Sequence, residues 1–155
     1  MNAEKFSNIS AICTENLPIE ELCRLWKASV RATHHFLSEN DIAQLEPYVR
    51  TALAQTEELY IYQQQEKICA FIGIEKGKTE MLFVAPSFFG RGIGSELIQF
   101  AITQRGANSV DVNEQNPAAL RFYQKHGFTI DSRSPTDDQG NPFPILHLKL
   151  LKTTD

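Results

Sequence analysis

The sequence has 155 residues, of which 22% are charged, and a formal net charge of -4 at pH 7. This length is enough for one sizeable core and short for two, so we expect a single domain over residues 1–155. The acidic balance disfavours a surface for nucleic acid or anionic lipid, and no apolar stretch is long enough to span a bilayer.

The first elements expected along the chain are a strand and an amphipathic helix. The strand is predicted around residues 8–14, and the helix over residues 17–33, where Asn16 and Pro18 suit a helix start. Helical spacing places one stripe of side chains toward the core, made up of Leu22, Leu25, Trp26, Ser29 and Val30.

A second helical region is predicted over residues 38–53. Ser38 and Asp41 have the spacing of a capping pair at its start. Pro47 lies inside the region and lacks the backbone N–H that a helix interior needs. We therefore expect two short helical pieces here rather than one.

The apolar period then changes from helical to strand-like. Three β-rich runs separated by polar residues predict an antiparallel meander, at residues 58–64, 67–75 and 78–86. The rest of the chain alternates helix, strand, helix, strand and strand, at residues 95–106, 108–114, 116–127, 128–133 and 143–151. The order β-α-α-β-β-β-α-β-α-β-β predicts an α/β fold with a mixed β-sheet flanked by helices.

Three glycines stand in "FFGRGIG", where the third run of the meander meets the next helix. Gly90, Gly92 and Gly94 would let free backbone N–H groups at a helix N-terminus approach a phosphate or pyrophosphate. A tight turn without a ligand explains the cluster about as well. The stretch lacks the Gly-Lys-Ser/Thr end of a Walker loop and the GxGxxG spacing of a dinucleotide site, so neither ATP nor NAD is expected.

Two stretches resemble the GNAT superfamily of N-acetyltransferases. "LFVAPSFFGRGIGSELIQFA" resembles its acetyl-CoA loop and "NEQNPAALRFYQKHGF" resembles its second motif, in the order and spacing of the family. More narrowly, "ATHHFLS", "VNEQN" and "DDQGNPFPILHL" resemble the bacterial YjaB-type subgroup. The resemblance implies an acetyl-CoA-dependent N-acetyltransferase that passes the acetyl group directly to a primary amine.

The resemblance also implies roles for single residues. Tyr123 would protonate the departing coenzyme A thiolate, although its ring also fits simple core packing. Asn116 would cap a helix, contact the pantetheine arm, or do both. The family carries Arg or Gln at the position of Phe89, so backbone amides and Arg91 are left to hold the phosphates. The expected cofactor contacts are Phe83, Val84, Phe89, Gly90, Arg91, Gly92, Ile93, Gly94, Ser95, Asn116 and Tyr123.

An alkylamine acceptor is protonated at neutral pH, so its attack requires a base or a water-filled route for the proton. Glu80 matches the position of a glutamate base in histone-acetylating members, but a glutamate at a strand start is often only a solvated edge residue. His34 and His35 are competing bases and are expected to line the acceptor pocket. Their spacing does not fit a metal site, so no metal is expected. The acceptor is a small-molecule amine or a protein lysine.

The remaining expectations concern location, assembly and rival functions. "MNAEKFSNIS" lacks the features of a signal peptide, and Cys13, Cys23 and Cys69 form an odd set without CxxC spacing. These features favour a cytoplasmic protein with reduced thiols. A homodimer is a reasonable default. A catalytically silent acyl-CoA-binding regulatory domain and an interaction domain that lost its ligand remain as alternatives.

Overall fold

The strands and helices follow one another in the order that the sequence predicts. The computed structural model describes residues 5–151. Its helices are α2 (Ile19–Thr33), α3 (Glu39–Gln55), α4 (Ile93–Arg105) and α5 (Pro117–Lys125), with 3-10 turns at Thr14–Asn16 and Pro86–Phe88. Its strands are β1 (Ile9–Ala11), β2 (Glu58–Gln64), β3 (Lys67–Glu75), β4 (Lys78–Val84), β5 (Ser109–Asn113), β6 (Phe128–Ser134) and β7 (Ile145–Leu150).

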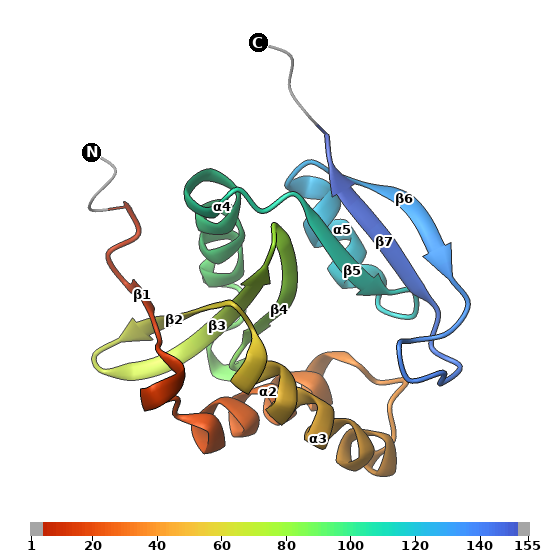
Figure 1. Cartoon of the computed structure of the whole chain (residues 1–155), viewed down its shortest axis with the longest axis horizontal. Coiled ribbons are helices and arrows are strands. Elements are labelled where there is room, and N and C mark those ends of the chain that lie inside the picture. Colours follow the sequence, from red (N-terminus) through yellow and green to blue (C-terminus); the bar gives the residue numbers. More distant parts are fainter. Residues whose placement is uncertain (1–4, 152–155) are drawn as a thin grey trace.

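The strands form one mixed sheet in the order β1-β2-β3-β4-β5-β7-β6. The predicted meander of β2, β3 and β4 is antiparallel, whereas β4 and β5 run parallel. The pairing of β4 with β5 is limited to Lys78 with Ser109 and Thr79 with Val110. Beyond these pairs the strands separate, and Figure 1 shows the two halves of the sheet spreading apart.

A bulge in β4 marks the point of separation. Gly73 of β3 pairs with Met81, and Ile74 pairs with Thr79, so Glu80 has no partner on β3. An extra residue of this kind bends its strand and increases the local twist. Because Glu80 follows the last pair with β5 directly, the bend opens a gap in the middle of the sheet.

Helices cover the two faces of the sheet unequally. One core lies against α4 and α5 and includes Ile72, Leu97, Val110 and Leu148. The other core lies against α2 and α3 and, within residues 5–151, takes its sheet residues from β2, β3 and β4 without β5, β6 or β7. The second half of the sheet therefore keeps one polar face, on which His147 Nδ1 and Asp111 Oδ1 form a hydrogen bond of 2.7 Å.

The structure confirms the predicted buried stripe of α2 and the predicted capping pair of α3. The predicted stripe of α2 is buried, together with Cys23. The capping pair of α3 is confirmed, because Ser38 Oγ accepts a hydrogen bond from the Asp41 N–H at 3.0 Å and Asp41 Oδ2 accepts one from the Ser38 N–H at 2.9 Å. These two bonds satisfy N–H groups that have no partner within the helix.

The predicted break at Pro47 is wrong, because α3 continues through it as one helix. Pro47 and Ala43, whose carbonyl loses its usual donor, are both exposed, so water can hydrate that carbonyl. Ion pairs on the inner side hold both parts of the helix against α2. Glu46, directly before Pro47, pairs with Lys27 at 2.7 Å. Arg50, which follows the proline, pairs with Glu20 at 2.8 Å.

Candidate active site

A cleft of about 940 Å³ runs through the gap between β4 and β5. Its walls come from the end of α2, the exposed edge of β4, the glycine-rich loop with the start of α4, and the strand β5 with α5 as far as Tyr123. All the sequence-predicted site residues except Arg91 line this cleft. Segments that lie far apart in the sequence thus converge where the sheet opens.

The glycine-rich loop enters α4 with left-handed backbone conformations. Gly90 has φ +76° and Gly92, the residue before the helix, has φ +78°. A Cβ atom at either position would meet no atom within 4 Å beyond the adjacent residues, so backbone geometry and not crowding requires glycine. Helix α4 begins at Ile93, two residues before the predicted start, and no side chain caps it. Its first N–H groups suit the pyrophosphate of acetyl-CoA.

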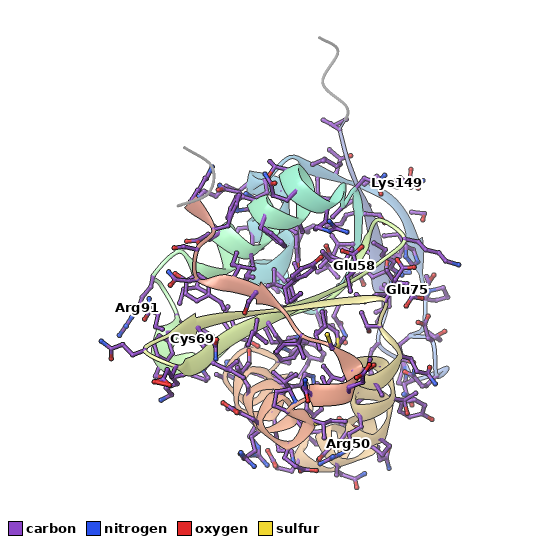
Figure 2. All side chains as sticks on the ribbon, turned by 60° about the vertical axis from the view of Figure 1, so that its left-hand side comes forward. Arg50, Glu58, Cys69, Glu75, Arg91 and Lys149 are labelled. Atoms are coloured by element: carbon purple, nitrogen blue, oxygen red, sulfur yellow. The ribbon has the colours of Figure 1, made fainter. Side chains whose placement is uncertain are left out.

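Phe89 and Arg91 lie at the outer edge of this loop. Phe89 is 41% exposed, which is unusual for a large apolar side chain. The Arg91 guanidinium stacks 5.0 Å from the ring centre of Phe88, and Arg91 lines a separate hollow together with Lys67. Figure 2 shows Arg91 at the rim of the molecule with its side chain directed outward. Arg91 therefore does not join the residues of the main cleft.

The edge of β4 offers free backbone donors to the cleft. The Ala85 N–H donates to the carbonyl of Cys69 on β3 at 2.8 Å. Alternate residues of an antiparallel strand turn their N–H groups to the same neighbour, so Leu82 and Val84 turn theirs the other way, toward β5. The ladder to β5 has already ended at Thr79. These two N–H groups lie on either side of Phe83, on the edge of β4 that borders the cleft.

Tyr123 lies on α5 and is 8% exposed. Its ring packs edge-on against Phe122, at 5.0 Å between ring centres, and against Phe128, at 5.7 Å. Burial raises the pKa of the Tyr123 hydroxyl, so this group stays protonated at neutral pH and can donate. The Tyr123 ring belongs to the core and the residue also lines the cleft, so packing in the core does not keep it from the site.

Glu80, the bulged residue of β4, has a side chain that is 39% exposed. Burial of its carboxyl raises its pKa above the usual range, and the Lys78 ammonium, 3.9 Å away, partly offsets this effect. Lys78 in turn lies 2.7 Å from Asp111 Oδ2. Glu80 and Asp111 thus face the cleft from opposite sides of the gap, with one ammonium group between them.

The two predicted acceptor-side histidines differ in burial. His35 is exposed, whereas His34 is partly buried at the end of α2. Burial lowers the pKa of His34 to about 4, and the neighbouring His35 lowers it further to a smaller extent. His34 is therefore neutral at physiological pH.

Several cleft residues were missed at the sequence level. Asp111 and Asn113 alternate with buried valines on β5, a pattern that signals an exposed strand face but no specific site. Thr79 is 2% exposed, and its hydroxyl has no hydrogen-bond partner within the described residues. It marks the apex of the gap, where a water or a bound ligand would satisfy it. No sequence signal distinguishes this threonine from an ordinary strand residue.

Between residues 5 and 151, no group of three or more His, Cys, Asp or Glu side chains is arranged to hold a metal ion. Cys69 is buried in β3, and burial raises the pKa of its thiol, which makes it a weak nucleophile. In the same part of the chain, no helix has the length and apolar character needed to cross a membrane.

Comparisons with known proteins agree with this geometry. A sequence model described as an acetyltransferase (GNAT) domain matches residues 55–130. The peptidyl-lysine N-acetyltransferase YjaB of Salmonella typhimurium is 37% identical over 129 residues, covering 83% of this chain and 89% of that protein. The solution structure of apo YjaB from Escherichia coli superposes with a TM-score of 0.82 at 34% identity, covering 94% of this chain and 97% of that one.

A more distant structure shares the fold alone. The PaiA N-acetyltransferase of Thermoplasma acidophilum, crystallised in complex with coenzyme A, superposes with a TM-score of 0.68 at 22% identity. The match covers 91% of this chain and 97% of that one.

Proposed function

The chain belongs to the GNAT family of acetyltransferases, and on this premise we propose that it acetylates lysine side chains of proteins. Membership of the family gives the reaction, which moves an acetyl group from acetyl-CoA to a primary amine. The name of the relative YjaB, a peptidyl-lysine N-acetyltransferase, supports a protein lysine as the acceptor. We also propose a cytoplasmic location, in which the free thiols of Cys13, Cys23 and Cys69 stay reduced.

The observation that carries this acceptor class is the ion-pair arrangement at the mouth of the gap. Lys78 Nζ lies 2.7 Å from Asp111 and 3.9 Å from Glu80, and both carboxylates line the cleft. The two carboxylates already hold one alkylammonium group of the same chemistry as an incoming lysine. A pair of carboxylates favours a cationic acceptor over a neutral one.

In the proposed reaction acetyl-CoA supplies the activated acyl group, and three protein groups act on the transfer. Glu80 accepts a proton from the lysine ammonium, so that the nitrogen lone pair can attack the acyl carbonyl. A backbone N–H of Leu82 or Val84 donates to the negative charge that develops on the carbonyl oxygen. Tyr123 then gives its hydroxyl proton to the sulfur as the carbon–sulfur bond breaks, and the second proton lost by the lysine nitrogen restores the Tyr123 hydroxyl.

The cofactor contacts complete the proposal. The loop from Phe89 to Gly92 and the N–H groups of Ile93, Gly94 and Ser95 would hold the pyrophosphate. Phe83 and Val84 would flank the thioester, and Asn116 would meet the pantetheine arm. Arg91 and Lys67, on the outer side of Phe88, would meet only a phosphate that extends beyond the loop.

An acceptor comparison tests this function. The purified protein is given acetyl-CoA with a lysine-containing peptide, the same peptide with its lysine ε-amine blocked, or a free polyamine, and release of coenzyme A thiol is followed. We expect the highest kcat/KM with the unblocked peptide, and mass spectrometry should place the acetyl group on the ε-nitrogen. Faster turnover of the polyamine or of the blocked peptide would reject the lysine assignment but leave the family reaction intact.

A further inference from the structure

His34 joins the end of α2 to the start of α5 across the cleft. Its Nε2 lies 3.4 Å from Nδ2 of Asn116, a residue 82 positions away in the sequence. Both residues line the cleft, and Asn116 is 8% exposed. A contact of this kind ties together two walls that no strand pairing connects.

The hydrogen bonds around His34 determine its tautomer. The Thr33 hydroxyl has one proton and donates it to the carbonyl of Ser29 at 2.8 Å. The same oxygen lies 2.8 Å from His34 Nδ1, so Nδ1 must carry a proton and donate to it. In a neutral ring Nε2 then has a free lone pair and can only accept.

The orientation of the Asn116 amide is determined in the same way. Its Oδ1 accepts a hydrogen bond from the Ala119 N–H at 3.2 Å and so caps α5. The Nδ2 group therefore faces His34 and donates to Nε2. These hydrogen bonds link Thr33, His34 and Asn116 in series. Each one joins a donor to an acceptor only while the His34 ring is neutral. A protonated ring would set two donors against each other at Nε2.

This arrangement leaves His34 with no free lone pair for an acceptor amine. The low pKa of the ring agrees with this, because a group with a pKa of about 4 is a poor base at neutral pH. Asn116, in contrast, has two amide protons and spends only one of them on His34. The second is available on the wall of the cleft, about two helical turns before Tyr123.

We propose that His34 is a positioning residue, which fixes the Asn116 amide so that its second N–H points into the cleft, and that it does not bind the acceptor amine. The ligand group for that N–H is an acceptor oxygen of the acyl-CoA arm, such as an amide carbonyl. His34 therefore acts on the cofactor side of the reaction, although it stands at the acceptor end of the cleft.

Nuclear magnetic resonance tests the hydrogen-bond chain directly. Long-range ¹H–¹⁵N spectra of the wild type should show the Nδ1-protonated tautomer at neutral pH. Asn116→Asp keeps an oxygen that can cap α5 but replaces the donor at Nε2 by a negative acceptor, so the pKa of His34 should rise by at least about two units. Asn113→Asp makes the same charge change at a neighbouring asparagine of the cleft, and it should raise the pKa of His34 far less.

Two outcomes of this experiment would overturn the proposal. One is a wild-type His34 that titrates near the ordinary histidine value with its Nε2 protonated. The other is an Asn116→Asp variant in which His34 titrates as in the wild type. Either result would mean that the two side chains are not coupled.

Kinetics separates positioning from acceptor binding. His34→Asn retains a donor near the Nδ1 position but cannot reach Asn116, whereas His34→Gln can present an acceptor near the Nε2 position. We expect His34→Asn to raise KM for acetyl-CoA about three- to tenfold, the size of one neutral hydrogen bond, with KM for the lysine peptide nearly unchanged. His34→Gln should restore most of the loss. A rise confined to the KM of the peptide would instead place His34 in the acceptor site and reject the proposal.

Discussion

The two sides of the cleft present different kinds of polar group. On the side proposed to hold acetyl-CoA the polar groups belong to the backbone, at the left-handed Gly90 and Gly92 and at the uncapped first turn of α4. On the side proposed to hold the acceptor they are side chains from separate elements, such as Glu80 on β4 and Asp111 on β5, held by mutual contacts. A backbone site is encoded in a few contiguous residues, whereas a side-chain site depends on how distant elements pack.

Tyr123 should show the largest effect, because in the proposed mechanism it acts in the chemical step itself. Tyr123→Phe keeps the ring packing but removes the proton donor, so kcat should fall by roughly 10² or more while the affinity for coenzyme A hardly changes. Steady-state kinetics and calorimetry measure the two quantities. Tyr62→Phe is the matched control, since Tyr62 is 5% exposed and lies off the cleft. Equal kcat in the wild type and the Tyr123 variant would reject the acid role.

Gly92 tests the backbone side. Valine is strained at φ +78°, and the free loop can relax out of this conformation whereas the ligand-bound loop cannot. The strain, about 2 kcal/mol, should therefore weaken coenzyme A binding roughly thirtyfold in Gly92→Val. Gly106→Val places the same residue at φ +71° at the other end of α4. Both variants should lose stability, but only the first should lose affinity, and equal affinities would mean that the phosphates lie elsewhere.

The contrast between the two sides also explains what the sequence could predict. The glycine loop and Tyr123 stand in contiguous motifs, so their positions on the cleft were accessible from the sequence. Asp111 and Thr79 were missed because their place depends on where β4 parts from β5, and the bulge at Glu80 that sets this point leaves no trace in the apolar pattern. The contact between His34 and Asn116 depends likewise on tertiary packing.

The error at Pro47 has a related physical cause. A proline in the interior of a helix costs one hydrogen bond, but the final cost depends on whether the released carbonyl reaches water and whether other contacts hold the helix. In α3 both conditions favour continuity, and neither can be read from local sequence. Local rules therefore predicted the start of this helix correctly and its interior wrongly.

Glu80 tests the side-chain side through pH. Since a base must be ionised and the pKa of Glu80 is raised, kcat/KM should fall on the acidic side at a pH above the ordinary carboxylate value. Glu80→Gln should remove this inflection and lower the neutral-pH rate roughly tenfold, because its partly exposed position lets water take over some of the proton transfer. Glu75→Gln, a nearby change of the same charge outside the cleft, should keep the inflection and move it only slightly to lower pH, because the Glu75 charge contributes to the raised pKa of Glu80. An unchanged profile in Glu80→Gln would transfer the base role to another group.

Phe89 should show the smallest effect, and the effect should be a gain. The resemblance to the family places an arginine or glutamine at this position, and here the backbone side of the cleft lacks that polar side chain. Phe89 is 41% exposed, so Phe89→Arg empties no core and should alter stability by no more than about 0.5 kcal/mol. An exposed charge near a phosphate is worth up to about 1 kcal/mol, which predicts two- to fivefold tighter coenzyme A binding at low salt and less at high salt. Phe89→Ala removes the ring without adding charge and should bind as the wild type does. If Phe89→Arg binds coenzyme A no tighter than Phe89→Ala does at low salt, the backbone amides hold the phosphates without help from a side chain at this position. The proposed cofactor side would then rely on backbone groups alone.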